Sequence, residues 1–334
     1  MLIFSGTLLI LFILDLFLGS VTIRPADIVN AIFGGSDTTV NAILTRFRVP
    51  KAITALLAGI SLSISGLQMQ TLFRNPLAGP YVLGISAGAS LGVAFVILGF
   101  SSNLSPDSLR GIGNWMIAAA SWVGAGIVML IIVYISSRVK DIMTVLIIGI
   151  MLSGGITAAV SIMQYFSSET MLKSYIVWTM GSLGNLTTPQ ISVFAVSVVF
   201  GIILSFLSVK MLNALLLGEN YAQSIGLNIK LARIVIFSST SILAGSVTAF
   251  CGPIGFIGIA VPHIARLFFR TSDHKILIPA TILTGGAVML ASDIISQVPG
   301  SENVLPVNSI TSLIGIPVVI WVILRRKQYS DLFR

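Results

Sequence analysis

Charged residues are scarce along the whole sequence, and this scarcity limits the folds that the chain can adopt. Only 9% of the 334 residues are Asp, Glu, Lys or Arg, whereas 55% are hydrophobic. A soluble domain carries roughly 25% charged residues, which it needs to cover a water-facing surface. A lipid bilayer suits this composition better than water does, so we predict an integral membrane protein.

Apolar stretches long enough to cross a bilayer recur along the chain, since a transmembrane helix takes about 20 predominantly apolar residues. The stretches are Leu2–Leu18, Ala52–Phe73, Val82–Phe100, Trp115–Ser136, Ile142–Phe166, Ile191–Val209, Leu231–Phe250, Ile254–Phe269, Ile276–Ile295 and Val307–Leu324. They predict an all-α, polytopic fold of about ten transmembrane helices, organised as a single domain over residues 1–334. The first stretch lacks a basic region before it and a convincing cleavage site after it, which indicates a retained helix.

The boundary between the seventh and eighth stretches is the weakest. Gly252 and Pro253 interrupt the apolar run there, and the eighth stretch is short. A broken or re-entrant segment at this point requires that its free backbone groups face protein or water.

Basic residues give the orientation. The C-terminal tail carries Arg325, Arg326, Lys327 and Arg334. The positive-inside rule places this tail in the cytoplasm, and ten spans then place the N-terminus there too.

Most of the 19 Lys and Arg residues fall in cytoplasmic segments, but the first outer loop is an exception. It contains or adjoins Arg24, Arg46, Arg48 and Lys51. Either these cations anchor a helix at the lipid headgroups, or they meet an acidic partner on the outer face.

The polar residues within the spans exclude several classes of protein. Asp15 and Asp293 fall near the outer ends of their helices, where we expect water to reach them, and neither has an evident opposite charge in a neighbouring span. This disfavours an ion-coupled secondary transporter, which stays the alternative. The sequence has no HExxH motif, nucleophile elbow or acidic metal cluster. With two His and only Cys251, it offers no His/Cys metal site of usual ligand number, so we expect no catalytic residue, metal or cofactor.

A transporter needs a source of energy, and this chain has no phosphate-binding loop, because it contains no Gly-Lys pair. An ATP-driven mechanism would therefore need a separate motor subunit on the cytoplasmic side. The longest cytoplasmic connection covers residues 211–230. Glu219 and Asn220 suit the start of a short helix there, and Gly226 suits its C-terminal cap. Such a helix could transmit the movement of a motor or simply connect two spans.

Five groups of motifs occur in order over nearly the whole chain. They are Arg48-Val49-Pro50-Lys51 with Ala58-Gly59 and Ser65-Gly66; Gln70 with Arg74-Asn75-Pro76-Leu77-Ala78 and the segment from Leu83 to Ala89; Leu217-Gly218 with Ala222 and Ile225-Gly226; the segment from Gly255 to Arg266 with Asp273-His274-Lys275; and Leu305-Pro306-Val307 with Gly315-Ile316-Pro317. Together they resemble the FecCD-type permeases, the membrane subunits of ABC importers for iron–siderophore complexes, haem and vitamin B12.

The resemblance implies an assembly as well as a fold. Members form a homodimer of ten-helix permeases around a central translocation path in the bacterial inner membrane. Two cytoplasmic P-loop ATPase subunits bind below, and a periplasmic or lipoprotein substrate-binding protein delivers the substrate from above; no nucleic acid takes part. An iron–siderophore complex is the first expectation for the cargo on family frequency, followed by cobalamin and haem.

The resemblance also assigns roles to residues. Docking of the binding protein falls to Arg48, with Arg46 and Lys51 as helpers. The groove of the ATPase subunit would receive Gly218, Glu219, Asn220, Ala222 and Gly226. The cytoplasmic gate or pathway would include Gln70, Asn75, Ile142, Met143 and Thr144. For His263 we expect a structural hydrogen bond and no metal, because the Pro-His pair is common to members with different substrates.

The sequence departs from the family pattern at a few of these positions. Lys51 stands where Arg is usual, and the stretch from Gln297 to Asn303 lacks a basic residue that some members carry. Ile142 and Met143 replace the small hydroxyl residues that the family often has, so the gate either seals by excluding water or these residues simply pack. Asn75-Pro76 is expected to begin a helix, since proline is tolerated at the first position.

Overall fold

The computed structural model describes the chain except for residues 20–22, 25, 28–37, 101–112, 298–303 and 332–334. Every regular element of the described part is helical. Six helices are long and apolar enough to cross a membrane: α4 (Val49–Leu72), α6 (Gly113–Arg138), α7 (Ile142–Tyr165), α9 (Thr188–Leu207), α12 (Ile229–Cys251) and α14 (His274–Ser296). Four further apolar elements accompany them: α1 (Leu2–Phe17), α5 (Ile85–Ala94) with the π-helix η3 (Phe95–Phe100), α13 (Ile257–Phe269) and α15 (Val307–Asp331), whose apolar part is Val307–Val322. Each predicted stretch overlaps one of these elements, which confirms the all-α, polytopic fold.

Six further short elements were not predicted as separate helices from apolar length. They are α3 (Thr38–Ile43), the π-helix η1 (Leu44–Arg48), the 3₁₀ helix η2 (Pro80–Leu83), α8 (Glu169–Thr179), α10 (Val209–Leu216) and α11 (Glu219–Ser224). Of these, only α11 follows the sequence-based expectation of a short helix between residues 211 and 230.

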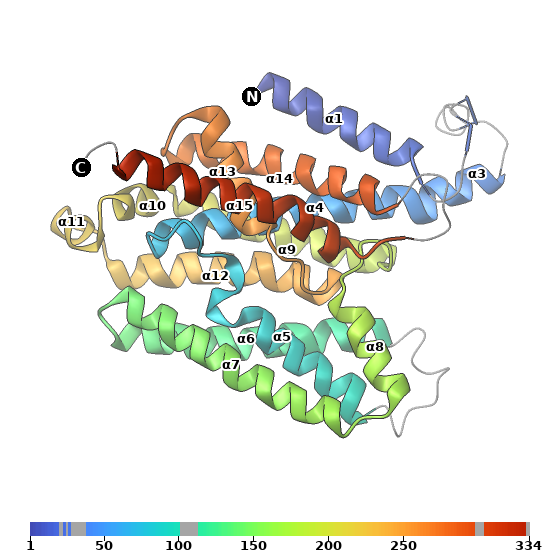
Figure 1. Cartoon of the computed structure of the whole chain (residues 1–334), viewed down its shortest axis with the longest axis horizontal. Helices are drawn as coiled ribbons and strands as arrows, with labels where there is room; N and C mark the ends of the chain where they lie inside the picture. Colours follow the sequence, from blue (N-terminus) through green and yellow to red (C-terminus); the bar gives the residue numbers. More distant parts are fainter. Residues whose placement is uncertain (20–22, 25, 28–37, 101–112, 298–303, 332–334) are drawn as a thin grey trace.

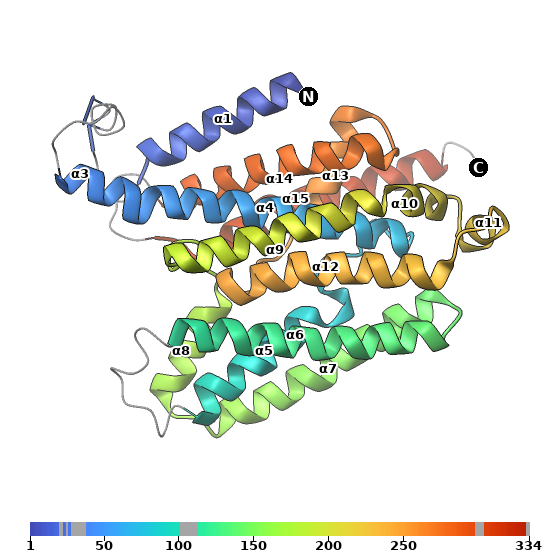
Figure 2. The ribbon, with the colours of Figure 1, turned by 180° about the vertical axis from the view of Figure 1, so that it is seen from behind.

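The long helices run roughly side by side and give the bundle two ends (Figure 1). We call them the α11 end, where α10 and α11 lie, and the α3 end, where α3 and α8 lie (Figures 1 and 2). Helix α1 begins, and helix α15 ends, toward the α11 end (Figure 1). Phe4 of α1 packs its ring against Phe268 and Phe269 at the close of α13, and α15 runs toward the C-terminus on the same side (Figure 1). The side chains of the basic tail from Arg325 onward lie outside the described residues.

Helix α4 is the centre of the packing. Of its most apolar stretch 83% of the residues are buried, against 17% for α7, which lies on the outside of the α5–α6–α7 layer (Figure 2). Small residues allow this density, because helices in lipid associate through close backbone approach. A Cβ atom on Gly59 would collide with the backbone of Gly285 in α14, and one on Gly66 would collide with the backbone of Gly258 in α13.

The chain breaks between α12 and α13, as the Gly252-Pro253 pair indicates. Gly252 has φ +77°, and α13 does not begin until Ile257. With 13 residues, α13 is about 20 Å long, which is shorter than the roughly 30 Å hydrocarbon core. Protein groups satisfy the freed backbone: Ser182 N–H donates to the Cys251 carbonyl at 2.8 Å, and Gly255 N–H donates to Asn308 Oδ1 at 2.9 Å.

The expected helix start at Asn75-Pro76 is wrong. Residues 73–79 form turns between α4 and η2, and Pro80 is the proline that opens a helix. Asn75 stabilises the turn by accepting the Leu77 N–H at 3.0 Å on its side-chain oxygen. The local hydrogen bonds of an Asn turn therefore take precedence over the preference of proline for a first helical position.

Candidate functional site

The short helix α11 presents an apolar face at its end of the bundle. Gly218 with φ +107° precedes it and Gly226 with φ +89° follows it, so both boundaries use backbone conformations that favour glycine. Tyr221 in α11 and Ile225 at its C-cap are exposed and lie four residues apart, on one side of the helix. Leu217, which precedes Gly218, is exposed as well. The predicted helix start at Glu219 and the predicted glycine cap are confirmed.

Ala222 lies on the opposite side of α11 and is completely buried. It belongs to the core cluster that also contains Leu212 and Leu215 of α10. The sequence-based hypothesis assigns Ala222 to the ATPase groove, but its methyl group packs inside this chain. A bulky residue at this position would therefore lift α11 from the bundle before it could reach a partner.

Arg233, in the first turns of α12, connects α11 to the link between α6 and α7. Its Nε and Nη2 atoms donate to both carboxylate oxygens of Glu219, at 2.8–3.0 Å. Its Nη1 atom donates to the carbonyls of Val139 and Ser136 at 3.0 and 3.3 Å, and Nη2 donates to that of Lys140 at 2.6 Å. No sequence motif pointed to Arg233; its only signal was a cation among apolar residues near Glu219.

Helix α7 starts at the predicted gate segment and is capped by Asp141. The carboxylate accepts the Thr144 hydroxyl at 2.7 Å and the N–H groups of Thr144 and Met143 at 2.9 and 3.2 Å. The Thr144 hydroxyl, followed by these N–H groups, lowers the pKa of Asp141, since each hydrogen bond favours the carboxylate. Ile142 is buried and Met143 is 41% exposed, so of the two apolar residues only Met143 presents its side chain to the surroundings.

Of the other predicted pathway residues, Gln70 connects the end of α4 to α13, whereas the hydrogen bonds of Asn75 stay within the turn after α4. Gln70 donates to the Ile259 carbonyl at 3.0 Å and accepts from Arg266 Nη1 at 2.6 Å. His263 hydrogen-bonds through Nε2 to the Pro76 carbonyl at 2.8 Å, which confirms the predicted structural role of this ring. Whether Gln70 or Asn75 contacts a substrate stays a prediction.

The predicted docking cations at the α3 end are not equivalent. Arg46 is exposed, whereas Arg48 is only 8% exposed and donates from Nη1 to the Leu16 and Phe17 carbonyls at 2.7 and 3.0 Å. Arg48 thereby satisfies carbonyls that the end of α1 leaves free. Arg46 is thus the one of these two arginines that lies at the surface.

The expectation that Asp15 and Asp293 are water-exposed and unpaired is wrong. Asp293 is completely buried and forms a 3.0 Å ion pair with Lys51 Nζ. Gln297 Nε2 donates to Asp15 Oδ1 and to Asp293 Oδ2, each at 3.0 Å. These residues are distant in sequence, so span-by-span inspection did not connect them. The rest of the stretch that lacks a basic residue, 298–303, lies outside the described residues.

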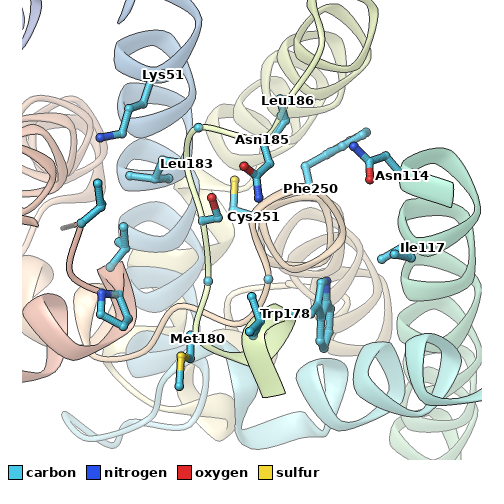
Figure 3. Close-up of a pocket in the computed structure, with 18 of the residues that line it drawn as sticks. Lys51, Asn114, Ile117, Trp178, Met180, Leu183, Asn185, Leu186, Phe250 and Cys251 are labelled. Atoms are coloured by element: carbon cyan, nitrogen blue, oxygen red, sulfur yellow. The ribbon is translucent and has the colours of Figure 1, made fainter. Parts of the chain in front are cut away.

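A cavity of about 1190 Å³ opens at the α3 end beside this cluster. Figure 3 shows the segment with Leu183, Asn185 and Leu186 between α4, which carries Lys51, and α6, which carries Asn114 and Ile117. Trp178, from the end of α8, and Phe250 add aromatic surface. The lining is therefore mainly apolar and amide-bearing, with Lys51 and Arg48 as its charged members.

No group of three or more His, Cys, Asp or Glu side chains in the described part of the chain is placed to share a metal ion. His274 is completely buried, and both of its ring nitrogens form hydrogen bonds, with Thr71 Oγ1 and Asn213 Oδ1, each at 2.8 Å. These contacts tie α4, α10 and α14 together at the α11 end.

Comparison with known proteins places this arrangement in a family. The sequence profile of the FecCD transport family matches residues 7–325. The chain belongs to the FecCD transport family. The match confirms the resemblance predicted from the five groups of motifs, and it identifies the chain as a membrane-spanning transport permease.

Individual relatives agree over most of their length. The chain is 34% identical to the hemin transport system permease protein HmuU of Yersinia pestis, with 86% of this chain and 84% of that protein covered. It is 33% identical to the vitamin B12 import system permease protein BtuC of Escherichia coli, with coverage of 85% and 84%. Among solved structures, a transporter described as of metal-chelate ABC type, in an inward-facing conformation, matches at a TM-score of 0.83 and 26% identity over 96% of this chain and 97% of that one.

Proposed function

We propose that the chain is the permease subunit of an ABC importer that moves an iron chelate across the bacterial cytoplasmic membrane. The family match over residues 7–325 supports this proposal most directly. Two copies would surround the translocation path, and both termini would face the cytoplasm. An iron–siderophore complex is the proposed cargo, with haem and cobalamin as the alternatives that the named relatives favour.

In this proposal α11 is the contact for a separate ATPase subunit. Leu217, Tyr221 and Ile225 are exposed in and beside α11, and a partner surface that covers them would remove three large apolar side chains from water. Gly218, Glu219, Asn220 and Gly226 shape the helix and its ends, while Ala222 fixes it to the bundle. The chain hydrolyses no ATP itself in this scheme.

The α3 end would receive the substrate-binding protein. Arg46 and Phe47 are exposed beside the cavity, so a cation and an aromatic ring are available to an acidic partner surface. Arg48 and Lys51 contribute by holding this corner of the bundle in place, since their charges are already engaged inside the chain.

The decisive experiment reconstitutes the chain in lipid nanodiscs with a P-loop ATPase and a binding protein encoded beside it. We expect stable co-purification, and ATP hydrolysis that responds to the binding protein loaded with ferric siderophore, haem or cobalamin. The loaded form that stimulates hydrolysis identifies the cargo. If no such ATPase associates with the chain, the importer proposal fails.

A point substitution tests whether α11 is the contact for the ATPase. Tyr221→Asp should abolish co-purification, because it puts a charge into the apolar face of α11. Gln223→Asp is the matched control, since residue 223 is exposed on the same helix but about 200° around it. Equal co-purification of both variants would remove α11 from the contact.

An ion-coupled secondary transporter is the second candidate, and one observation favours it. Asp15 and Asp293 form the buried acidic pair that such carriers use, joined through Gln297. The ion pair between Asp293 and Lys51 argues for a structural role instead. Uptake by the chain alone in liposomes, driven by a proton or sodium gradient without ATP, would establish this candidate.

A further inference from the structure

Arg233 occupies a junction between three segments of the chain. It lies in α12, its side chain is 4% exposed, and its guanidinium reaches Glu219 at the start of α11 and the carbonyls of Ser136, Val139 and Lys140. The pair with Glu219 is bidentate, a geometry that only the planar fork of arginine supplies. The junction therefore fixes the orientation of the two partners as well as their distance.

The second partner of Arg233 leads directly into α7. Ser136 belongs to the last turn of α6, and Val139 and Lys140 form the connection before Asp141, which caps α7. The carbonyls at the end of a helix have no partner within it, so Arg233 takes the place that water would otherwise occupy. A displacement of this connection must shift the first turn of α7.

The main packing contacts of α11 are with α10 and α12. Ala222 packs into the core beside α10, and the chain continues from α11 into α12. Glu219 is the residue through which α11 contacts the connection between α6 and α7, by way of Arg233. A force on α11 can thus reach the α7 start through a charged side-chain link whose arginine is 4% exposed.

We propose that Arg233 is the positioning residue that transmits movement of α11 to the start of α7, and thereby couples ATP hydrolysis to opening of the pathway. The inference rests on the proposed docking of an ATPase at α11. Glu219 is the receiving end of the link, and the carbonyls of residues 136–140 are the transmitting end. The link is discrete: a lysine at position 233 keeps the charge but cannot hold Glu219 and these carbonyls together.

The test uses the full complex of permease, ATPase and binding protein in proteoliposomes. Arg233→Lys should assemble normally and keep basal ATP hydrolysis, while substrate transported per ATP falls about tenfold, within the range by which residues on a coupling route act. The double exchange Arg233→Glu with Glu219→Arg should stay uncoupled, because a carboxylate at position 233 cannot donate to the carbonyls. Lys230→Gln, which removes an exposed cation three residues away, is the control.

The outcomes separate the two proposals. Failure of the unsubstituted chain to bind the ATPase refutes the proposed function. Normal assembly with unchanged transport per ATP in Arg233→Lys refutes the link. Recovery of coupling in the double exchange would also refute it, because that result reduces Arg233 to a partner of Glu219.

A measurement on the permease alone covers the case in which a variant does not assemble. In a Cys251→Ser background, spin labels at Ser224→Cys in α11 and Met143→Cys in α7 report the distance between these helices in nanodiscs. We expect one narrow distance distribution with Arg233 and at least a twofold broader one with Arg233→Lys. Identical distributions would overturn the proposal.

Discussion

At the scale of single residues, the α3 end shows how this chain accommodates charge inside an apolar bundle. Asp293 is completely buried. Lys51 forms an ion pair with it, and Gln297 donates a hydrogen bond to it. Breaking a buried pair by removing one partner is strongly destabilising, because the remaining charge is left desolvated and uncompensated. The arrangement thus fixes α1, α4 and α14 relative to one another.

Replacement of Lys51 tests this account. Lys51→Met should lower the free energy of unfolding by about 3–5 kcal/mol, since it leaves Asp293 buried without its cation. Thermal unfolding in detergent is the measurement. Arg46→Met is the matched control, because that side chain is exposed. Equal unfolding temperatures for the two variants would show that the pair contributes nothing to stability.

The sequence predicted these residues only in part. Arg48 and Lys51 were singled out because basic residues concentrate in the predicted first outer loop, and that placement stays a prediction. Their partners were not identified, because Asp15 and Asp293 approach Lys51 only through the packing of α1 and α14 on α4. Arg233 was not identified for a related reason. Most of its partners are backbone carbonyls, which every residue carries, so the sequence does not indicate them.

At the scale of elements, glycine positions decide which helices can touch. Gly66 faces the backbone of Gly258, so α4 and α13 approach more closely than any side chain permits. A Cβ atom added to Gly126 in α6 would meet no other heavy atom within 4 Å. The residue type is the same at both positions, so only the surroundings show that helix packing requires Gly66 and does not require Gly126.

Alanine substitutions should resolve this difference. Gly66→Ala is expected to destabilise the fold by about 1–3 kcal/mol or more, because the added methyl meets fixed backbone that cannot move aside. Gly126→Ala should be neutral or stabilising by up to about 1 kcal/mol, through the higher helix propensity of alanine. The yield of monodisperse protein and its unfolding temperature give the comparison. A Gly66→Ala variant as stable as Gly126→Ala would contradict the close approach.

Apolar length predicted the spanning elements well and the connecting ones poorly. The break at Gly252-Pro253 was predicted, since those residues interrupt an apolar run. Helices α8 and α10 were not, because each is shorter than a span and merges with, or follows closely on, an apolar stretch. Their boundaries depend on caps and packing, which hydropathy does not register.

At the scale of the whole molecule, the two ends of the bundle differ in what they offer a partner. The α11 end presents Leu217, Tyr221 and Ile225, and the α3 end presents Arg46, Phe47 and the cavity. An importer driven by a separate ATPase needs this asymmetry, because energy and substrate arrive from opposite sides of the membrane. The proposed function therefore requires α11 to lie in the cytoplasm and α8 to lie outside.

Cysteine accessibility decides this orientation in intact cells. Cys251 is the only cysteine of the sequence and is buried, so introduced thiols can be labelled against a low background. Ser168→Cys precedes α8 and Ser224→Cys ends α11; both positions are exposed, and the replacements are nearly isosteric. A membrane-impermeant maleimide should modify residue 168 directly and residue 224 only after permeabilisation. Labelling of residue 224 from outside would place α11 beyond the reach of any cytoplasmic ATPase, and the docking and coupling roles given to it would both fall.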